Sequence, residues 1–168
     1  MKILIIGSAR HGKDTVAEMI NEITGMTFQS SSQAAADIFI YETLRVKYGY
    51  TNPVECFEDR INHRAEWHDM ICDYNKNNKA RLAKDILKTS DIYVGMRSNE
   101  ECSACIEQEI FDYIIGVYDP RKPIEDKSSF NIDIWAKSDF VIPNSGTLDD
   151  LLHRVGKIAE FLTPKYAF

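Results

Sequence analysis

Nine residues near the N-terminus have the types and spacing of a phosphate-binding loop. The stretch reads GSARHGKDT (7–15), and it follows residues 2–6, which are nearly all aliphatic. Glycine lets the backbone curl so that successive N–H groups face a phosphate, and a following helix points its positive end at the same space. Lys13 adds a mobile charge for the β- and γ-phosphates of a nucleotide. The alternative is a glycine-bearing turn between a strand and a helix, with an incidental lysine.

Asp14 stands where such loops normally carry a serine or threonine hydroxyl that coordinates Mg²⁺. A carboxylate oxygen is also a good hard ligand for Mg²⁺, so Asp14 is a candidate metal ligand, directly or through water. It could instead accept the proton of an acceptor group, as an aspartate does in some kinases. An acidic residue in the first turn also favours the helix dipole. Thr15 keeps a second hydroxyl, placed for the α-phosphate.

Arginines from separate segments distinguish transfer between two phosphates from simple hydrolysis. Arg60 and Arg64 are four residues apart, which places them on one face of a predicted helix. Arg97 follows a predicted strand, at the sheet edge where α/β proteins bind ligands, and Arg121 lies in a polar loop. Planar guanidinium donors can clamp an acceptor phosphate and offset charge in the transition state. Arg97 is the strongest of these candidates, and a surface ion pair is the alternative for each.

The elements around these residues alternate between strand and helix. Short aliphatic runs predict strands over 2–6, 26–29, 91–95, 111–118 and 138–144. Apolar periodicity and caps predict helices over 13–23, 33–48, 79–89, about 99–108 and 148–162. Residues 53–77 read as one long polar helix or two broken ones. The pattern predicts a single α/β domain over 1–168, with a parallel sheet between helices and a lid-like loop over about 119–130. The helical segment over about 50–80 carries Arg60 and Arg64, which makes it the candidate acceptor-binding segment.

Composition narrows the class of protein. The chain has 168 residues, 44% hydrophobic and 27% charged, which is typical of a soluble globular protein. A net charge of −6 argues against a surface built wholly for nucleic acid, although a local basic groove stays compatible with it. With no apolar run near the roughly 20 residues of a membrane span and no signal pattern, we expect a cytoplasmic protein without membrane contact. Cys102 and Cys105 form a lone C-x-x-C pair, for which reduced thiols on one helix face are expected.

Taken together, the chain resembles the bacteriophage deoxynucleoside monophosphate kinases, a family of P-loop kinases. The resemblance covers most of the length and includes the Gly-Lys-Asp-Thr variant of the loop. Four segments carry it in order: GSARHGKDTVAEMI (7–20), EDR (58–60), YVGMRSNEE (93–101) and SDFVIPNSGTLDDL (138–151).

The resemblance implies a nucleoside monophosphate kinase-like fold and transfer of the γ-phosphate of ATP to a deoxynucleoside monophosphate. It implies that Arg60 and Arg64 contact the acceptor, and that Arg97 lies on phosphate at the reacting centre. Asp14 would hold Mg²⁺, and Lys13, Asp14 and Arg97 would be catalytic. Gly95 departs from the family, which carries an aspartate at that strand end. The residues implied to bind ATP are Gly7, Arg10, His11, Gly12, Lys13, Asp14 and Thr15.

Two further functions stay open. Related small phage kinases phosphorylate 5-hydroxymethyluracil bases within DNA, which requires an open groove with basic and aromatic residues. Candidates for such a groove are Arg45, Lys47, Arg60, Arg64, Lys76, Lys79 and Arg81. The third reading is a non-catalytic P-loop NTP-binding module. A phage protein of this kind would act in the host cytoplasm, and a homodimer is one option for its assembly.

Overall fold

The computed structural model describes residues 1–163, and five parallel strands form its central sheet in the order β2-β3-β1-β4-β5. The strands are β1 (Ile3–Ile6), β2 (Phe28–Ser30), β3 (Ile92–Val94), β4 (Tyr113–Tyr118) and β5 (Phe140–Pro143). β1 pairs with β3 on one side and with β4 on the other. The predicted α/β class with a parallel sheet is confirmed.

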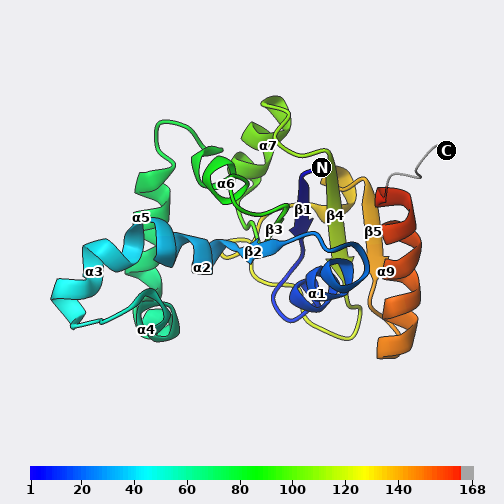
Figure 1. Ribbon diagram of the computed structural model, residues 1–168, viewed down its shortest axis with the longest axis horizontal. Helices are drawn as coiled ribbons and strands as arrows, with labels where there is room; N and C mark the ends of the chain where they lie inside the picture. The colour runs from blue at the N-terminus through cyan, green and yellow to red at the C-terminus, as the bar shows by residue number, and fades with distance from the viewer. Residues whose placement is uncertain (164–168) are drawn as a thin grey trace.

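The central strand is buried on both faces, as parallel sheets require. All four of its residues are fully buried; Ile3 and Ile5 face one helical layer, while Leu4 and Ile6 face the other. The first layer consists of α1 (Lys13–Thr24) and α9 (Leu148–Leu162). The second contains α6 (Arg81–Ile86), α7 (Asn99–Glu107) and α8 (Ile134–Lys137), together with α2 (Ser31–Ala35). Figure 1 shows this arrangement of helices around the sheet.

Local capping explains where the two helices of the first layer begin and end. α1 starts after Gly12, whose φ is 99°, and stops at Gly25, whose φ is 75° and whose N–H donates to the Asn21 carbonyl. α9 starts with a capping box: the Asp150 N–H donates to Oγ1 of Thr147, and the Thr147 N–H donates to Oδ2 of Asp150. The predicted helix over 148–162 is therefore confirmed.

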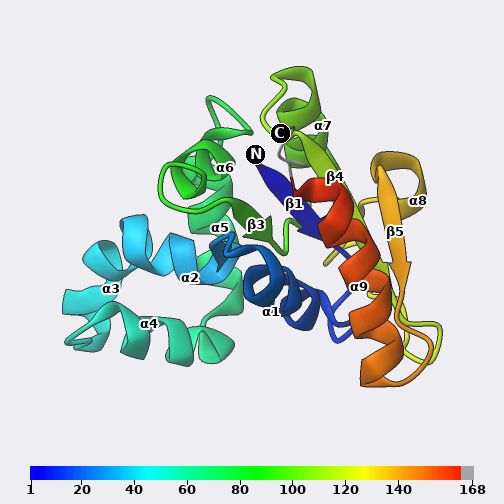
Figure 2. The same cartoon turned by 45° about the vertical axis from the view of Figure 1, so that its right-hand side comes forward.

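A helical lobe is inserted between β2 and α6 and projects past the β2 edge of the sheet (Figures 1 and 2). Its own small core consists of Ala35, Ala36, Ile40, Leu44, Cys56 and Trp67. After α2, the lobe contains a π-helical turn η1 (Ala36–Ile40), α3 (Tyr41–Tyr48), α4 (Pro53–Asp59), a 3-10 turn η2 (Arg60–Asn62) and α5 (Arg64–Tyr74). Of the two options for 53–77, the broken helix is therefore correct.

The short helix α8 was not predicted from the sequence. α8 spans four residues, too few for apolar periodicity, and depends on Asp133, whose carboxylate accepts N–H groups of Trp135 and Ala136. Within residues 1–163, no helix has the length and apolar content needed to cross a bilayer.

Helix α7 directs a carboxyl and two thiols into the protein. Cys102 and Cys105 lie on its buried face, and burial raises the pKa of both thiols, that of Cys105 to about 12. Glu101 is also buried and accepts a hydrogen bond of 3.1 Å from the Tyr93 hydroxyl. Burial raises the pKa of Glu101 to about 7, although the Tyr93 hydrogen bond and the charge of Lys79 oppose the shift. The carboxyl is therefore neutral at acidic pH in the folded protein.

This raised pKa predicts a pH-dependent loss of stability. The folded-state pKa of Glu101 lies above its ordinary value of 4.5. The resulting contribution to the free energy of unfolding is therefore fully present below about pH 4.5 and is lost as the pH rises through about 7. We expect Glu101→Gln, which keeps the hydrogen-bond acceptor, to gain up to about 3 kcal/mol of unfolding free energy relative to wild type between about pH 5 and pH 8. Urea unfolding at both pH values measures this gain.

The exposed Glu107 on the same helix gives the matched control, because Glu107→Gln is expected to show no such divergence. Parallel stability curves for wild type and Glu101→Gln would contradict the assignment.

Candidate active site

The loop between β1 and α1 needs its two glycines for steric reasons. A Cβ at Gly7 would collide with the carbonyl oxygen of Val117 in β4. A Cβ at Gly12 would lie 2.6 Å from Nδ2 of Asn144, and the φ of 99° is itself unfavourable for an L side chain. Arg10, at the exposed tip of the loop, has a φ of 64°. The loop is therefore curled tightly against β4 and the segment after β5.

Lys13, the residue proposed from the sequence to hold phosphate, lies across this loop. Its ammonium donates to the Ser8 carbonyl at 2.9 Å. Burial lowers the pKa of Lys13, the charge of Arg97 lowers it further, and Asp14 and Glu125 oppose the shift. Lys13 and Arg97 are thus close enough to interact, although they follow different strands.

Arg97 reaches this position because the chain turns sharply after β3. Gly95 has a φ of 92°, its N–H donates to the Ile5 carbonyl at 3.0 Å, and its carbonyl accepts a hydrogen bond from the Ser31 hydroxyl. The left-handed backbone gives a physical reason for glycine where the resembling family has aspartate. Met96 is buried, and the half-exposed Arg97 then directs its guanidinium toward the loop.

A carboxylate that the sequence did not single out completes the site. Oε2 of Glu125 accepts the Ala9 N–H at 2.7 Å, and Oε1 accepts Nη1 of Arg97 at 2.8 Å. Burial would raise the pKa of Glu125, but the hydrogen bonds from Arg97 and Ala9 and the charge of Lys13 outweigh it and lower the pKa. The ionised Glu125 carboxylate therefore bridges the phosphate loop and Arg97. Its position in a polar loop carries no pattern from which this role could be predicted.

His11 has a structural role beyond its place in the loop. Its ring is buried; Nδ1 accepts the Asp119 N–H at 3.0 Å, and Nε2 lies 3.1 Å from the Pro123 carbonyl. These partners require the neutral tautomer with its proton on Nε2. The side chain predicted to bind nucleotide is thus bonded to the segment after β4, and the backbone N–H of His11 donates to the Ser8 carbonyl at 3.3 Å.

Arg121 is held by protein groups at the other side of the same segment. Its guanidinium donates to both carboxylate oxygens of Asp119 and to the carbonyls of Asn144 and Gly146. The hydrogen bond from Arg121 lowers the pKa of Asp119 to about 2. Asn144, which the sequence analysis did not assign, donates to the His11 carbonyl at 3.2 Å. The lid-like segment is therefore bonded to the loops after β1 and β5.

Arg60 and Arg64 do not share a helix face. Arg60 begins the 3-10 turn η2, Arg64 begins α5, and His63 between them has a non-helical φ of −132°. Arg60 stacks 3.7 Å from the centre of the Phe57 ring and donates to the Phe57 carbonyl. Burial lowers the pKa of Arg60, and the charge of the exposed Arg64 lowers it further, so the two side chains remain neighbours.

The loop fits a nucleotide phosphate chain with a divalent cation. The first-turn N–H groups of α1 and Lys13 supply donors, and Thr15 supplies a hydroxyl. Asp14 is exposed in that turn and offers one carboxylate ligand. Among residues 1–163 no group of three acidic, histidine or cysteine side chains could hold a metal by itself. A Mg²⁺ ion would therefore take its other ligands from phosphate oxygens and water.

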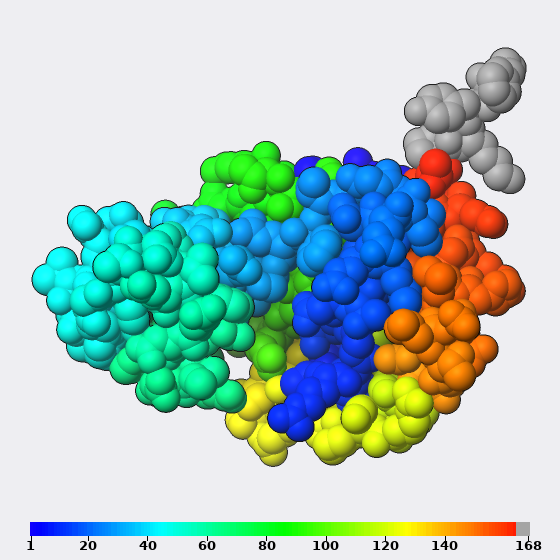
Figure 3. Space-filling model, turned by 60° about the horizontal axis from the view of Figure 1, so that its bottom comes forward, coloured from blue at the N-terminus to red at the C-terminus, as the bar shows by residue number. Residues whose placement is uncertain are grey.

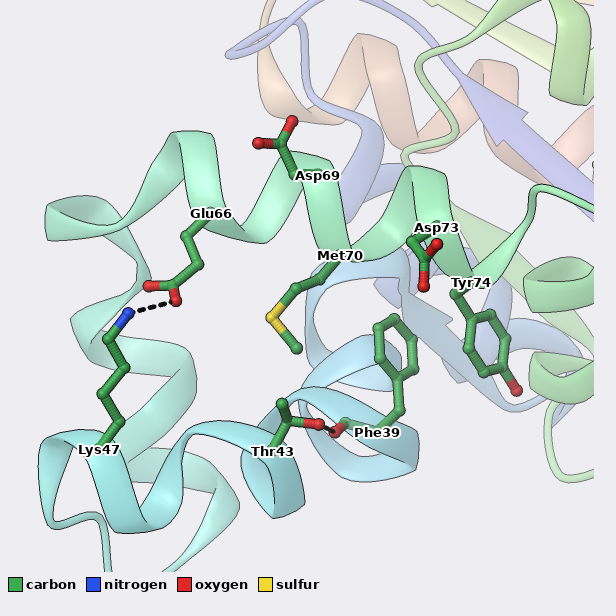
Figure 4. A pocket seen from close by; sticks show the side chains of 8 residues that line it. All are labelled: Phe39, Thr43, Lys47, Glu66, Asp69, Met70, Asp73 and Tyr74. Carbon is green, nitrogen blue, oxygen red and sulfur yellow. Dashed lines mark hydrogen bonds and ion pairs between the residues drawn. The ribbon is translucent and has the colours of Figure 1, made fainter.

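The surface has one depression beside the helical lobe and another within it. Figure 3 shows the surface hollowed between the lobe and the loop that follows β1. A separate cavity of about 720 Å³ lies within the lobe, between η1–α3 and α5 (Figure 4). Its lining includes Glu66, Asp69 and Asp73 against one lysine, Lys47, which pairs with Glu66 at 2.7 Å. Such an acidic cavity repels phosphate, so the hollow beside the loop is the better candidate for an acceptor.

The buried histidine gives a testable consequence. We expect His11→Ala to lower the unfolding free energy by about 2 kcal/mol, because the Asp119 N–H loses its acceptor and a cavity forms. The exposed His68 is the matched control, and His68→Ala should cost less than about 0.5 kcal/mol. Urea unfolding measures both variants, and equal small effects would contradict the anchoring role of His11.

Comparisons with known proteins agree with this architecture. No protein-family model and no curated protein sequence matches the chain. Among solved structures, shikimate kinase from Aquifex aeolicus vf5 aligns with a TM-score of 0.51 and 16% identity, over 96% of this chain and 98% of its own. Dephospho-CoA kinase from Campylobacter jejuni aligns with a TM-score of 0.54 and 12% identity, over 96% and 97%. The chain therefore has the fold of the small P-loop kinases, with a parallel sheet of order 2-3-1-4-5 between helices.

Proposed function

We propose that the protein is a magnesium- and ATP-dependent kinase that transfers the γ-phosphate of ATP to a deoxynucleoside monophosphate. The observation that carries the proposal is that Arg97, from the strand next to the phosphate loop, pairs at 2.8 Å with the Glu125 carboxylate, whose other oxygen accepts the Ala9 N–H of that loop. A simple nucleotide-binding module needs the loop and its lysine only. A second cation from another strand is the feature that transfer between two phosphates requires.

In this proposal, each residue of the site has a role in phosphate transfer that follows from its position. The loop amides and Lys13 hold the phosphates of ATP, and Thr15 lies beside the phosphate nearest the nucleoside. Arg97 offers planar donors between the two substrates, where negative charge accumulates during transfer. Asp14 is placed to hold Mg²⁺, which when bound neutralises charge on the phosphate oxygens. An oxygen of the acceptor phosphate bonds to the γ-phosphorus while its bond to the bridging oxygen breaks, which yields ADP and a deoxynucleoside diphosphate.

The helical lobe supplies the acceptor side in this proposal. Arg60 and Arg64 lie together at the junction of α4 and α5, and the lobe borders the hollow beside the phosphate loop (Figure 3). Arg64 is exposed and its guanidinium is accessible to a phosphate. The Arg60 guanidinium stacks on the Phe57 ring and donates to the Phe57 carbonyl, so its positive charge is fixed at this junction. A monophosphate acceptor has the charge that such a pair recognises.

The pairing of other basic residues favours a free nucleotide over DNA. Two of the seven candidates for a DNA groove stack on aromatic rings, Arg60 on Phe57 and Arg81 on Tyr74. Four others pair with carboxylates: Arg45 with Glu42, Lys47 with Glu66, Lys76 with Asp73, and Lys79 with Glu100. Their carboxylate partners cancel much of the field that a polymer backbone would need. Modified DNA is the alternative acceptor, and the following experiment distinguishes it from a free nucleotide.

A phosphotransfer assay with γ-labelled ATP tests the proposal. We expect label on a nucleoside diphosphate when each deoxynucleoside monophosphate is offered in turn. Lys13→Ala should lower the rate at least about a hundredfold, because the mobile charge on the transferring phosphate is lost. Label found only on DNA containing 5-hydroxymethyluracil would overturn the choice of acceptor. Binding of ATP without transfer to either acceptor would favour a non-catalytic module.

The unusual aspartate of the loop has its own test. We expect Asp14→Asn to lower the transfer rate about tenfold or more at limiting magnesium, and excess Mg²⁺ to restore part of it, if the carboxylate is a metal ligand. Glu18→Gln, one turn along the exposed side of α1, is the charge-matched control and should behave as wild type. A loss in Asp14→Asn that magnesium does not relieve would instead indicate a proton acceptor.

A further inference from the structure

Glu125 occupies donors that a triphosphate would use. Its two carboxylate oxygens accept the Ala9 N–H of the phosphate loop at 2.7 Å and Nη1 of Arg97 at 2.8 Å. Its own N–H donates to the Ser8 hydroxyl at 3.3 Å, which keeps the residue against the loop. A carboxylate and a terminal phosphate share the property that decides this contact, since both present several anionic oxygens to nearby N–H groups.

The position of these donors along the loop indicates which phosphate they serve. The first-turn amides of α1, from Lys13 to Thr15, lie at the helix end of the loop and hold the phosphates nearest the nucleoside. Ala9 lies on the opposite arm, two residues after Gly7, and Arg97 comes from the β3 side of the sheet. With the first two phosphates at the helix end, the last phosphate of a triphosphate would extend toward these two donors, whereas a diphosphate would stop short of them.

We propose that Glu125 is a specificity-determining residue of the γ-phosphate subsite, which a nucleoside triphosphate must displace and a nucleoside diphosphate leaves in place. The inference rests on the proposed function and adds a residue to it. The single Ala9 N–H cannot serve two anions, and the Glu125 carboxylate beside Arg97 repels an incoming phosphate, so triphosphate binding carries the cost of moving this carboxylate away from the loop. The contact therefore weakens binding of ATP relative to ADP.

The surroundings of Glu125 provide room for the displaced side chain. A cavity of about 360 Å³ lies beside it, between the end of β4 and residues 124–135. Lys127 and Asn131 line this cavity with Glu125 and offer it new polar partners. His11 and Arg121 hold the segment at 119–123, so the displacement involves the Glu125 side chain and the residues after Pro123.

Calorimetric titration with two nucleotides tests the inference. The probes are ADP and the non-hydrolysable imido analogue of ATP, each titrated at constant magnesium into wild type, Glu125→Ala and Glu125→Gln. We expect Glu125→Ala to bind the triphosphate analogue about tenfold more tightly than wild type, because a charge-assisted contact no longer has to break, while ADP affinity changes less than about twofold. Glu125→Gln should fall between the two, since its amide oxygen still accepts the Ala9 N–H.

Asp126→Asn is the matched control. It removes the same charge from the next residue, whose carboxylate accepts the Ser128 N–H, and should leave both affinities unchanged. Equal changes for the two nucleotides, or weaker triphosphate binding by both Glu125 variants, would overturn the inference while leaving the kinase proposal standing. Wild-type protein that binds neither nucleotide would contradict the kinase proposal itself, and the inference with it.

Discussion

The site depends on a concentration of positive charge and backbone N–H donors at the carboxyl ends of β1 and β3. Lys13 and Arg97 lie close enough that the charge of Arg97 contributes to the lowered pKa of Lys13, after burial. Such a cluster is favourable only when an anion accompanies it. In the structure that anion is the carboxylate of Glu125, and in the proposed reaction it is the phosphate chain. The need for an anion beside these cations is thus met by Glu125 in the free protein and by phosphate in the proposed complex.

The residues that hold the cluster in place add little charge to it. His11 is a neutral imidazole, because its Nδ1 accepts the N–H of Asp119, and Asn144 contributes an uncharged amide to the same loop. Arg121 is charged, but it donates to both carboxylate oxygens of Asp119, which neutralise its charge. The loop is therefore anchored from β4 and β5 without raising the repulsion that Lys13 and Arg97 already experience.

Much of this could be predicted from the sequence because it is local. Short stretches of sequence contain the aliphatic run of β1, the glycines of the loop, Lys13 and the capping box of α9. Arg97 could be assigned to the sheet edge because it comes shortly after β3. The contacts of Glu125 with Ala9 and of Asn144 with His11 join residues 116 and 133 positions apart, and no local pattern announces them. Arg60 and Arg64 were misplaced on one helix face because nothing in the residue types signals the break at His63.

In the proposed reaction, the phosphate loop and the hollow beside the helical lobe form one continuous site for two substrates. Titration with linked inhibitors, in which adenosine is joined through a chain of five phosphates to each of the four deoxynucleosides in turn, tests it most directly. We expect one-to-one binding of at least one of these compounds, tighter than ATP by about a hundredfold or more, because a single molecule fills both halves of the site. Linked compounds that all bind no more tightly than ATP would contradict it.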